Sequence, residues 1–428
     1  MSADSDPSSV PPTDSAARIA VVALNALPLV EPNARQTVGG LETFAWNLAK
    51  ALASSGRQVS FVVRSPRRLT RTRVDGVDVL AAVEPLRAIR NEVSSSIDFG
   101  SGRPRLNRWN FGLLWKLPLL AAARLTGRRP ALLQRLANLL RPAPPTVVIG
   151  FGVSADSRAT IEAAAELGSH SIVWFQSNAD LDPRLFTESS YRNEYGVTSA
   201  DAQKCLELAD VLIAQTGRQR DLLSQVSNRK AVVIPNPVDL AAFSPPASDA
   251  RDGVLWIGRY DRTHKRPLLA LEIARLCPDV QFRFAISPGQ PDVAAEFEQR
   301  RPENVTVIAP LPHAQMPAAM CQAKLLLSTG SLEHEGFPNV LLEAAATGTP
   351  IVSLEDFDQF LDRSHAGVAT RGDVNLAASS INAMLSDRDR WRSHSQAGRE
   401  YVRQHHSITQ LVGTLGPWLA PGPAVERA

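Results

Sequence analysis

The sequence has few cysteines and no long apolar run. Among its 428 residues only Cys205, Cys277 and Cys321 are cysteines, and they are too scattered for a disulfide framework or a metal-ligand spacing. This usage predicts a reducing compartment, so we expect a cytoplasmic protein. No run of 18 apolar residues occurs, so we expect no membrane-spanning helix.

Acidic residues are absent between Asp98 and Asp156, whereas residues 99–149 carry nine Lys or Arg. Within this stretch, residues 109–140 mix Trp, Leu and Arg and predict two amphipathic helices that separate around residues 126–130. Two interpretations stay open. The segment is either an ordinary helical part of the fold with solvated arginines, or a surface at residues 103–141 that lies on anionic lipid at the inner face of the cell membrane. No nucleic-acid motif accompanies it, so we expect no nucleic-acid partner.

The rest of the chain alternates apolar strand-like runs with helix-like segments, and its 44% apolar and 21% charged residues are typical of globular proteins. Strand–helix alternation predicts an α/β protein with parallel sheets covered by helices on both faces. We expect two tandem Rossmann-like, doubly wound domains that face a central cleft, because ligands bind outside the carboxyl ends of such strands.

The boundaries of these parts follow from changes in composition. Residues 235–253 are rich in Pro, Asp and Ser and predict a linker. We expect a disordered tail at residues 1–16, an N-terminal domain at 17–234 with its basic segment at 99–145, a C-terminal domain at 254–390, and a final segment at 391–420.

The stretch EHEGFPNVLLEA (333–344) places two carboxylates around the start of a predicted helix. Pro338 is suited to the first helical turn, and Gly348 to the residue just past the helix end. The helix body is apolar nearly all round, so a charged Glu343 there is costly unless it is paired. Glu335 precedes a helix N-terminus that would attract an anion. A ligand with a central phosphate and hydroxyls at both ends, such as a nucleotide sugar, would satisfy this pattern.

Cations and glycines follow two other strands. Gly258 and Arg259 end the predicted first strand of the C-terminal domain, and Lys265 follows in a basic loop, which suits a diphosphate or is simply solvated. Gly39 and Gly40 follow the first strand of the chain and would allow close approach of a ligand to the backbone, or form a flexible loop. Three Asp-x-Asp pairs at 180–182, 356–358 and 387–389 lack supporting His or Glu clusters, so we predict no metal site.

Five segments together resemble the retaining glycosyltransferases of family 4, which have the GT-B fold. They are the GGLE at 39–42, IPNPVDLAAF at 234–243, GRYDRTHKRP at 258–267, EGFPNVLLEAAATGTPIV at 335–352 and GREYVRQHHS at 398–407. The resemblance runs from about residue 18 to 419 and is stronger in the C-terminal half.

The resemblance implies roles for these residues. Glu335 would bind donor-sugar hydroxyls at the reacting centre, while Arg259 and Lys265 would neutralise the departing diphosphate. Glu343 would take the ribose hydroxyls, and residues near Pro310 and Leu311 would line the base. No metal or other cofactor is needed. The implied donor-binding positions are Gly39, Gly40, Gly258, Pro310, Leu311, Gly336, Phe337, Pro338, Asn339 and Glu343. The final segment, 391–419, would form the helix that crosses back to the first domain.

Two departures from the family concern its other substrate. Many relatives have a histidine on the acceptor side, but the first 169 residues contain none, and Gln176 or Asn178 is the candidate for that place. Residues 354–362 replace a Gly-Gly-x-Pro-Glu loop. We expect a metal-independent retaining transferase that moves a sugar from a nucleoside diphosphate to a glycan or lipid-linked acceptor. The alternatives are a non-catalytic nucleotide-sugar-binding protein, or an epimerase or phosphorylase on the same fold.

Overall fold

The structure is a computed structural model that describes residues 17–31, 39–70, 72–84, 86–98, 105–106, 110–126, 131–193, 195–245 and 251–420. The predicted tail at 1–16 lies outside these residues. The chain forms two compact units. The first contains the residues up to Gly150, Ala159–Ser171 and those from Gly416 to Gly422, and the second contains Phe151–Arg158 and Ile172–Leu415.

The N-terminal half builds an eight-stranded sheet in the order β10-β9-β8-β7-β1-β2-β4-β3, parallel except for the β3–β4 hairpin at its edge. Alanine and valine side chains of its strands pack against α5 and α6. The strands are β1 (Arg18–Val22), β2 (Gln58–Ser65), β3 (Arg73–Val74), β4 (Val77–Val83), β7 (Val147–Phe151), β8 (His170–Trp174), β9 (Val211–Ala214) and β10 (Ala231–Val233). The helices are α1 (Leu27–Val30), α2 (Gly40–Ser54), α3 (Arg87–Ser96), α4 (Leu113–Thr126), α5 (Leu132–Leu140), α6 (Ala155–Glu166), α7 (Arg184–Thr187), α8 (Ser199–Leu208) and α9 (Gly217–Val226).

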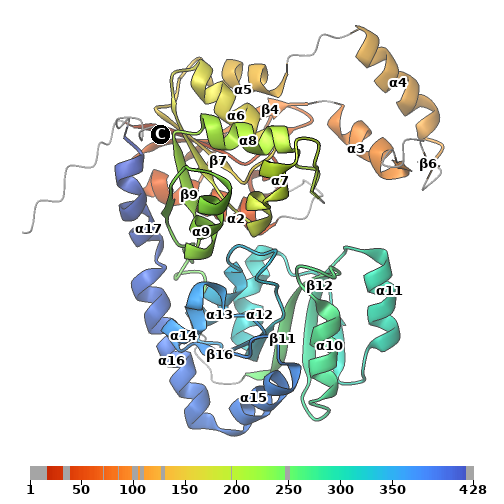
Figure 1. Ribbon diagram of the computed structural model, residues 1–428, viewed down its shortest axis with the longest axis vertical. Helices are drawn as coiled ribbons and strands as arrows, with labels where there is room; N and C mark the ends of the chain where they lie inside the picture. The colour runs from red at the N-terminus through yellow and green to blue at the C-terminus, as the bar shows by residue number, and fades with distance from the viewer. Residues whose placement is uncertain are drawn as a thin grey trace, which may run out of the picture. The chain divides into compact units, whose positions relative to one another are not determined.

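The C-terminal half builds a parallel sheet in the order β13-β12-β11-β14-β15-β16 (Figure 1). This is the strand order 3-2-1-4-5-6 of the Rossmann fold, so the connections reverse direction between β11 and β14. Its strands are β11 (Asp252–Arg259), β12 (Phe282–Ser287), β13 (Val305–Ile308), β14 (Ala323–Ser328), β15 (Ile351–Ser353) and β16 (Gly367–Ala369). Its helices are α10 (Pro267–Arg275), α11 (Pro291–Arg300), α12 (Met316–Gln322), α13 (Asn339–Thr347), α14 (Phe360–Ser364), α15 (Val374–Ser386), α16 (Arg388–His405) and α17 (Ile408–Leu415).

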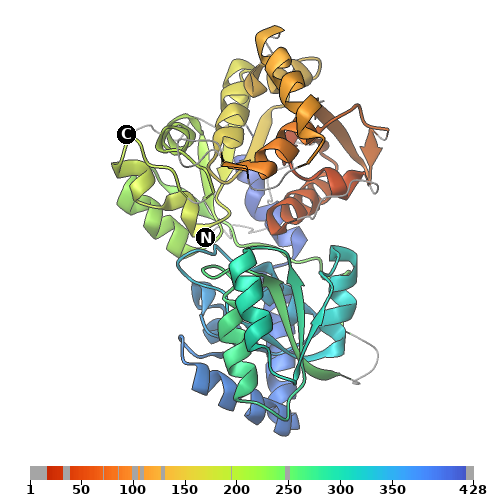
Figure 2. The same cartoon turned by 90° about the vertical axis from the view of Figure 1, so that its right-hand side faces the viewer.

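Alternating side chains of these strands pack into two separate hydrophobic cores, one on each face of the sheet. Val254 and Trp256 of β11 pack on the side of α10 and α15, whereas Leu255 packs on the side of α12 and α13. Helices therefore cover both faces of the sheet, as predicted, and Figure 2 shows this half from a second direction. The sequence and the structure agree on a GT-B-type pair of parallel-sheet α/β domains.

The predicted helix after Glu335 is confirmed as α13, with a small shift at its start. Pro338 is the N-cap of α13, with φ −71° and ψ 111°, rather than its first helical residue as predicted. Gly348 ends this helix in the left-handed conformation, as predicted. The predicted linker ends two residues early, because Asp252 already pairs with Ala323 in the sheet. Among the described helices, none combines the length and apolarity needed to cross a membrane.

Candidate functional site

The candidate site is built from the loops that follow β11 and β14, the two neighbouring strands at which the sheet reverses direction. A ligand site is expected at this point of an open α/β sheet, outside the carboxyl ends of the strands. Gly258 near the end of β11 has no room for a side chain, because a Cβ would lie 2.4 Å from the Trp256 ring and 3.1 Å from Cβ of Lys265. This glycine lets the stem of Lys265 pass close to the strand.

Glu335 lies in the loop after β14 and is 9% exposed. Its Oε2 accepts a hydrogen bond of 2.6 Å from the Lys265 ammonium. Its Oε1 is buried and has no hydrogen-bond partner among the described residues. A Cβ at Gly330 would lie 2.7 Å from this oxygen. The structure therefore holds one carboxylate oxygen in place and leaves the other as an unused acceptor, which is costly to bury without a ligand.

Glu343 occupies the first turns of α13 and is 8% exposed. Its Oε2 is also buried without a partner among the described residues, and its Oε1 lies 4.0 Å from Nε2 of His313. Burial raises the pKa of Glu343 to about 7, although the positive charge of Lys265 acts against this rise. The carboxyl group is therefore poised between its neutral and charged forms near neutral pH.

Arg259 at the end of β11 is half-exposed and forms an ion pair of 2.8 Å with Asp261. Asp261 also accepts hydrogen bonds from the backbone N–H groups of Thr263 and His264. Burial acts to raise the pKa of Asp261, but the His264 N–H and the Arg259 guanidinium hold it below its usual value. Asp261 stays charged and keeps the guanidinium at the carboxyl end of the strand.

The loop between Glu335 and α13 is fastened to other parts of the second unit. The Phe337 N–H donates to Oε1 of Gln215 (3.2 Å), and Oδ1 of Asn339 accepts from Nδ2 of Asn236 (2.8 Å). A Cβ at Gly336 would lie 2.7 Å from Oε1 of Gln215, so a glycine is needed there. Phe337 is one of the implied donor-binding positions, and its backbone N–H is thus already bonded to Gln215. The first backbone N–H groups of α13 have no acceptor one turn back in the helix. These groups are therefore the ones left for a phosphate at the helix N-terminus.

The predicted base-lining residues follow β13. Pro310 is exposed, and Leu311 packs against the core beneath α13. His313 comes two residues later, in a short 3-10 helix, and its approach to Glu343 places this loop beside that carboxyl group. Sequence reasoning missed His313, because nothing in its local sequence indicates that it lies near Glu343.

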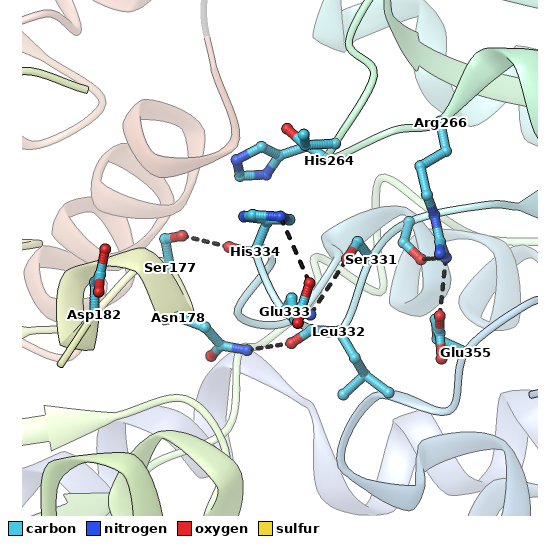
Figure 3. Close-up of polar contacts among 12 residues, drawn as sticks. Ser177, Asn178, Asp182, His264, Arg266, Ser331, Leu332, Glu333, His334 and Glu355 are labelled. Atoms are coloured by element: carbon cyan, nitrogen blue, oxygen red, sulfur yellow. Dashed lines mark hydrogen bonds and ion pairs between the residues drawn. The ribbon is translucent and has the colours of Figure 1, made fainter. Parts of the chain in front are cut away.

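Both acceptor-side candidates form hydrogen bonds to other parts of the second unit, and Figure 3 shows those of Asn178 and its neighbour Ser177. Asn178 donates from Nδ2 to the Leu332 carbonyl (2.7 Å), and the neighbouring Ser177 hydroxyl donates to the His334 carbonyl (2.5 Å). Gln176 accepts at Oε1 from Nε2 of Gln215 (3.1 Å). These contacts position the loop that carries Glu335. Oδ1 of Asn178 is buried without a partner among the described residues and is the amide atom left for a ligand.

Two histidines that the sequence did not single out stand next to Glu335 and Lys265. Figure 3 shows the rings of His264 and His334 one above the other, and their centroids lie 5.2 Å apart. His264 Nε2 also contacts the Tyr195 hydroxyl. Burial, with the nearby His334 and Lys265, lowers the pKa of His264 to about 4. His264 is therefore neutral at neutral pH.

Gly39 and Gly40 belong to the first unit, where they begin α2. The Gly39 N–H donates to Oε2 of Glu42 (3.1 Å), so the Gly-Gly-Leu-Glu segment forms its own helix cap. A Cβ at Gly39 would lie 2.7 Å from that oxygen. A side chain at this position would therefore have to displace the Glu42 carboxylate from the cap.

At least one aspartate of each Asp-x-Asp pair accepts hydrogen bonds within the fold. Asp180 accepts from the backbone of Gln176 and Ser177, and Asp387 caps α16. Asp358 accepts from the Gly217 N–H (2.9 Å). Within the described ranges, no group of three or more His, Cys, Asp or Glu side chains is placed to hold a metal ion.

Two known protein families match parts of this chain. Glycosyltransferase Family 4 matches residues 38–242, and a second family described as glycosyl transferase-like matches residues 262–415. Together the two matches cover most of the chain. The two matches support a glycosyltransferase of the family 4 type. No curated protein matches its sequence.

Solved structures with the same fold are distant in sequence. Sucrose-phosphate synthase from Thermosynechococcus elongatus is 17% identical with a TM-score of 0.65. Anabaena HepE in complex with UDP-glucose is 13% identical with a TM-score of 0.64. A S. aureus TarM mutant in complex with fondaparinux, alpha-GlcNAc-glycerol and UDP is 12% identical with a TM-score of 0.65. Each match covers 94% of this chain and 99% of the other, so this glycosyltransferase has the GT-B fold over its length.

Proposed function

We propose that this glycosyltransferase moves a sugar from a nucleoside diphosphate sugar to a hydroxyl group of a glycan or lipid-linked acceptor, with retention of anomeric configuration. One observation carries the proposal. Two buried carboxylate oxygens, Oε1 of Glu335 and Oε2 of Glu343, lack partners among the described residues and stand on either side of the start of α13. Both require hydrogen-bond donors, and a nucleotide sugar brings hydroxyls at its two ends and an anion between them.

This arrangement suggests where the sugar, the diphosphate and the ribose of the donor bind. Glu335 accepts hydroxyls of the transferred sugar, and Glu343 accepts the ribose hydroxyls beside His313. The diphosphate lies between them, at the N-terminus of α13, where the helix dipole favours an anion. Arg259 and Lys265, from the neighbouring strand end, supply positive charge for the phosphate that leaves. These two cations take the place of a metal ion, so the reaction is metal-independent.

The transfer step needs no protein base. The bond from the sugar carbon to the phosphate oxygen breaks, and the acceptor oxygen attacks from the same face. The leaving phosphate oxygen takes the acceptor proton, so charge and atoms balance. Glu335 and Lys265 orient the sugar and the phosphate, while Oδ1 of Asn178 is left to accept from a substrate hydroxyl. The hydrogen bond between Gln176 and Gln215 is consistent with a role of Gln176 in positioning the loop that carries Glu335.

The acceptor side is proposed to work at an anionic membrane surface. Residues in and just before α4 expose large apolar side chains, namely Phe111 (79%), Leu114 (62%), Trp115 (55%), Leu117 (40%) and Leu119 (39%). Such a face is typical of helices that lie in the lipid interface. The structure does not describe the side chains of Arg103, Arg105, Arg108, Arg124, Arg128 and Arg129.

Three other cations of the basic segment are paired inside the fold. Lys116 contacts Glu92, Arg135 lies 3.6 Å from Glu84, and Arg141 lies 2.5 Å from Glu166. All three acidic partners come from outside residues 99–149. These three cations are therefore not free to contact lipid headgroups.

A donor screen with one matched pair of variants tests the proposal. We expect one of the UDP-, GDP-, ADP- or dTDP-sugars to raise the melting temperature, with UDP-sugars first because HepE and TarM hold UDP-glucose and UDP. The same donor should be slowly hydrolysed by the wild type, and Glu335→Gln should lose this activity. Glu333→Gln, whose side chain is 82% exposed, is the control. Stabilisation without hydrolysis or transfer would favour the non-catalytic alternative, and no stabilisation by any donor would refute the proposal.

A further inference from the structure

The second unit contains a pocket whose lining does not include the two carboxylates of the proposed donor site. It has a volume of about 200 Å³ and is lined by the linker residues Pro235 and Pro237, by Phe337, and by residues on both sides of the junction between α16 and α17. For comparison, a cavity of about 150 Å³ holds benzene. The pocket is therefore large enough for one six-membered ring with a substituent.

Five rings line the pocket, those of Phe337, Phe360, Tyr401, His405 and His406, and each contacts at least one of the others. The Phe337 ring meets Phe360 edge-on, with centroids 5.5 Å apart, and stacks on His406 at 6.2 Å. Tyr401 lies 5.8 Å from both Phe360 and His406. Burial lowers the pKa of His406 to about 4, so this ring is neutral at neutral pH. Such a wall favours a ring-shaped ligand.

Two exposed basic side chains, Arg363 and His405, also line the pocket. Arg363 makes one long hydrogen bond of 3.5 Å to Gln359, and among the described residues it forms no ion pair. Asp358 is the acidic group of the lining, and it already accepts a hydrogen bond from the Gly217 N–H. The lining thus offers a guanidinium that forms no ion pair among the described residues and lies beside a wall of rings, and its positive charge also acts on Asp358. This combination suits an anion carried on a ring.

We propose that this pocket binds a small organic anion built on a single ring, and that its occupancy changes the rate of sugar transfer. Aromatic carboxylates and sugar phosphates share this chemistry. Arg363 holds the anionic group, and Phe337, Phe360 and Tyr401 hold the ring. Binding is independent of the proposed function, whereas the effect on transfer rests on it.

The coupling to the proposed donor site runs through three direct contacts. Phe337 lies two residues after Glu335, and its N–H is held by Gln215, which also lines the pocket. Asn236 of the linker donates to Asn339 at the start of α13, and its carbonyl lies 2.7 Å from Nδ1 of His406. A ligand that moves the Phe337 ring therefore acts on the segment that carries Glu335.

Calorimetric titration of the full chain, with and without saturating UDP, tests binding. The probes are benzoate, glucose 6-phosphate and, as a ringless anion, inorganic phosphate. We expect benzoate or glucose 6-phosphate to bind with one-to-one stoichiometry whether or not UDP is present, and phosphate not to bind. The identity of the binding probe distinguishes an aromatic acid from a sugar phosphate.

Three variants locate the binding site. Arg363→Gln should weaken binding by about tenfold or more, as expected for loss of a charged hydrogen bond. Thr414→Trp, an exposed position on α17 that lines the pocket, should abolish binding by filling it. Arg392→Gln, an exposed arginine of α16 outside the lining, is the matched control and should bind as the wild type does.

Each contrary outcome bears on a different part of the proposal. Absence of saturable binding, unchanged binding in both pocket variants, or competition by UDP would overturn the pocket assignment. Binding that leaves the transfer rate of an active enzyme unchanged would overturn the regulatory effect alone. If no transferase activity exists, the titrations still decide whether the pocket binds a ligand.

Discussion

The ammonium group of Lys265 lies 2.6 Å from Oε2 of Glu335, while Oε1 of the same carboxylate has no partner among the described residues. The ion pair fixes the direction of the carboxylate, and the unpaired oxygen is the part open to a ligand. Lys265 follows β11 and Glu335 follows β14, so the pair joins the two strands between which the sheet reverses direction. One contact therefore joins the residue proposed to bind the donor sugar, Glu335, to the residue proposed to stabilise the leaving phosphate, Lys265.

The first prediction concerns this pair. Glu335→Gln should lower kcat by about 100-fold or more, because the amide cannot hold Lys265 and accept sugar hydroxyls as the carboxylate does. The dissociation constant for the nucleoside diphosphate should change little. Steady-state kinetics and calorimetry measure the two effects, with Glu333→Gln as the control. Normal turnover in Glu335→Gln would show that the carboxylate has another role.

The second prediction concerns the pH dependence of donor binding. Burial raises the pKa of Glu343 to about 7, and ribose hydroxyls would favour its charged form. Donor binding should then release a proton below that pH, so affinity should rise from pH 6 to pH 8 and level off. Glu343→Gln should remove this dependence. Calorimetry in buffers of different ionisation enthalpy measures the proton release, and an equal slope in both proteins would contradict the assignment.

The third prediction concerns stability and the same carboxyl group. Because its pKa is raised above the ordinary value of 4.5, its contribution to stability is fully present below pH 4.5 and is lost as pH rises through about 7. As pH rises from 4 to 8, the free energy of unfolding of Glu343→Gln should therefore increase relative to that of the wild type by up to about 3 kcal/mol. Melting temperatures of both proteins across this range measure the effect. A constant difference would mean that Glu343 titrates normally.

The sequence predicted the parts of the site that depend on local signals. The two carboxylates around the start of α13, the glycines and the cations after β11 are all readable from spacing, caps and strand ends. The fold class was predictable for the same reason, since apolar runs of strand length alternate with helical segments. Gly258 was chosen for its place at a strand end, but the structure shows that it is needed because of Trp256.

Contacts between distant segments could not be predicted in this way. Gln215 lies 122 residues from the Phe337 amide that it holds, and Asn236 lies 103 residues from Asn339. Helix α9 was missed because its sequence, GRQRDLLSQV, has little apolar periodicity and buries only Gln219 and Leu223. Counting charges along residues 99–149 also could not show that Lys116, Arg135 and Arg141 pair with acidic groups elsewhere in the chain.

The fourth prediction concerns metal ions. Transfer should survive excess EDTA, because Arg259, Lys265 and the start of α13 supply the positive field. Arg259→Ala should lower kcat/KM by about tenfold or more, as expected for loss of charged hydrogen bonds to the diphosphate. Arg262→Ala is the control, since Arg262 pairs with Asp292 and Glu296 instead. Loss of activity on chelation, restored by Mn²⁺ or Mg²⁺, would revive a metal-dependent mechanism.

The last prediction concerns the membrane surface. The protein should co-sediment with anionic liposomes, and less so at high salt, because screening weakens the attraction of arginines to lipid headgroups. Replacing Leu114 and Trp115 together by Glu should abolish sedimentation, since both side chains are more than half exposed and would have to enter the lipid interface. Leu376→Glu, at an exposed leucine of α15, is the matched control. If the double variant sediments as well as the wild type, or if neutral and anionic liposomes bind equally, the exposed face of α4 serves another purpose and the segment is an ordinary part of the fold.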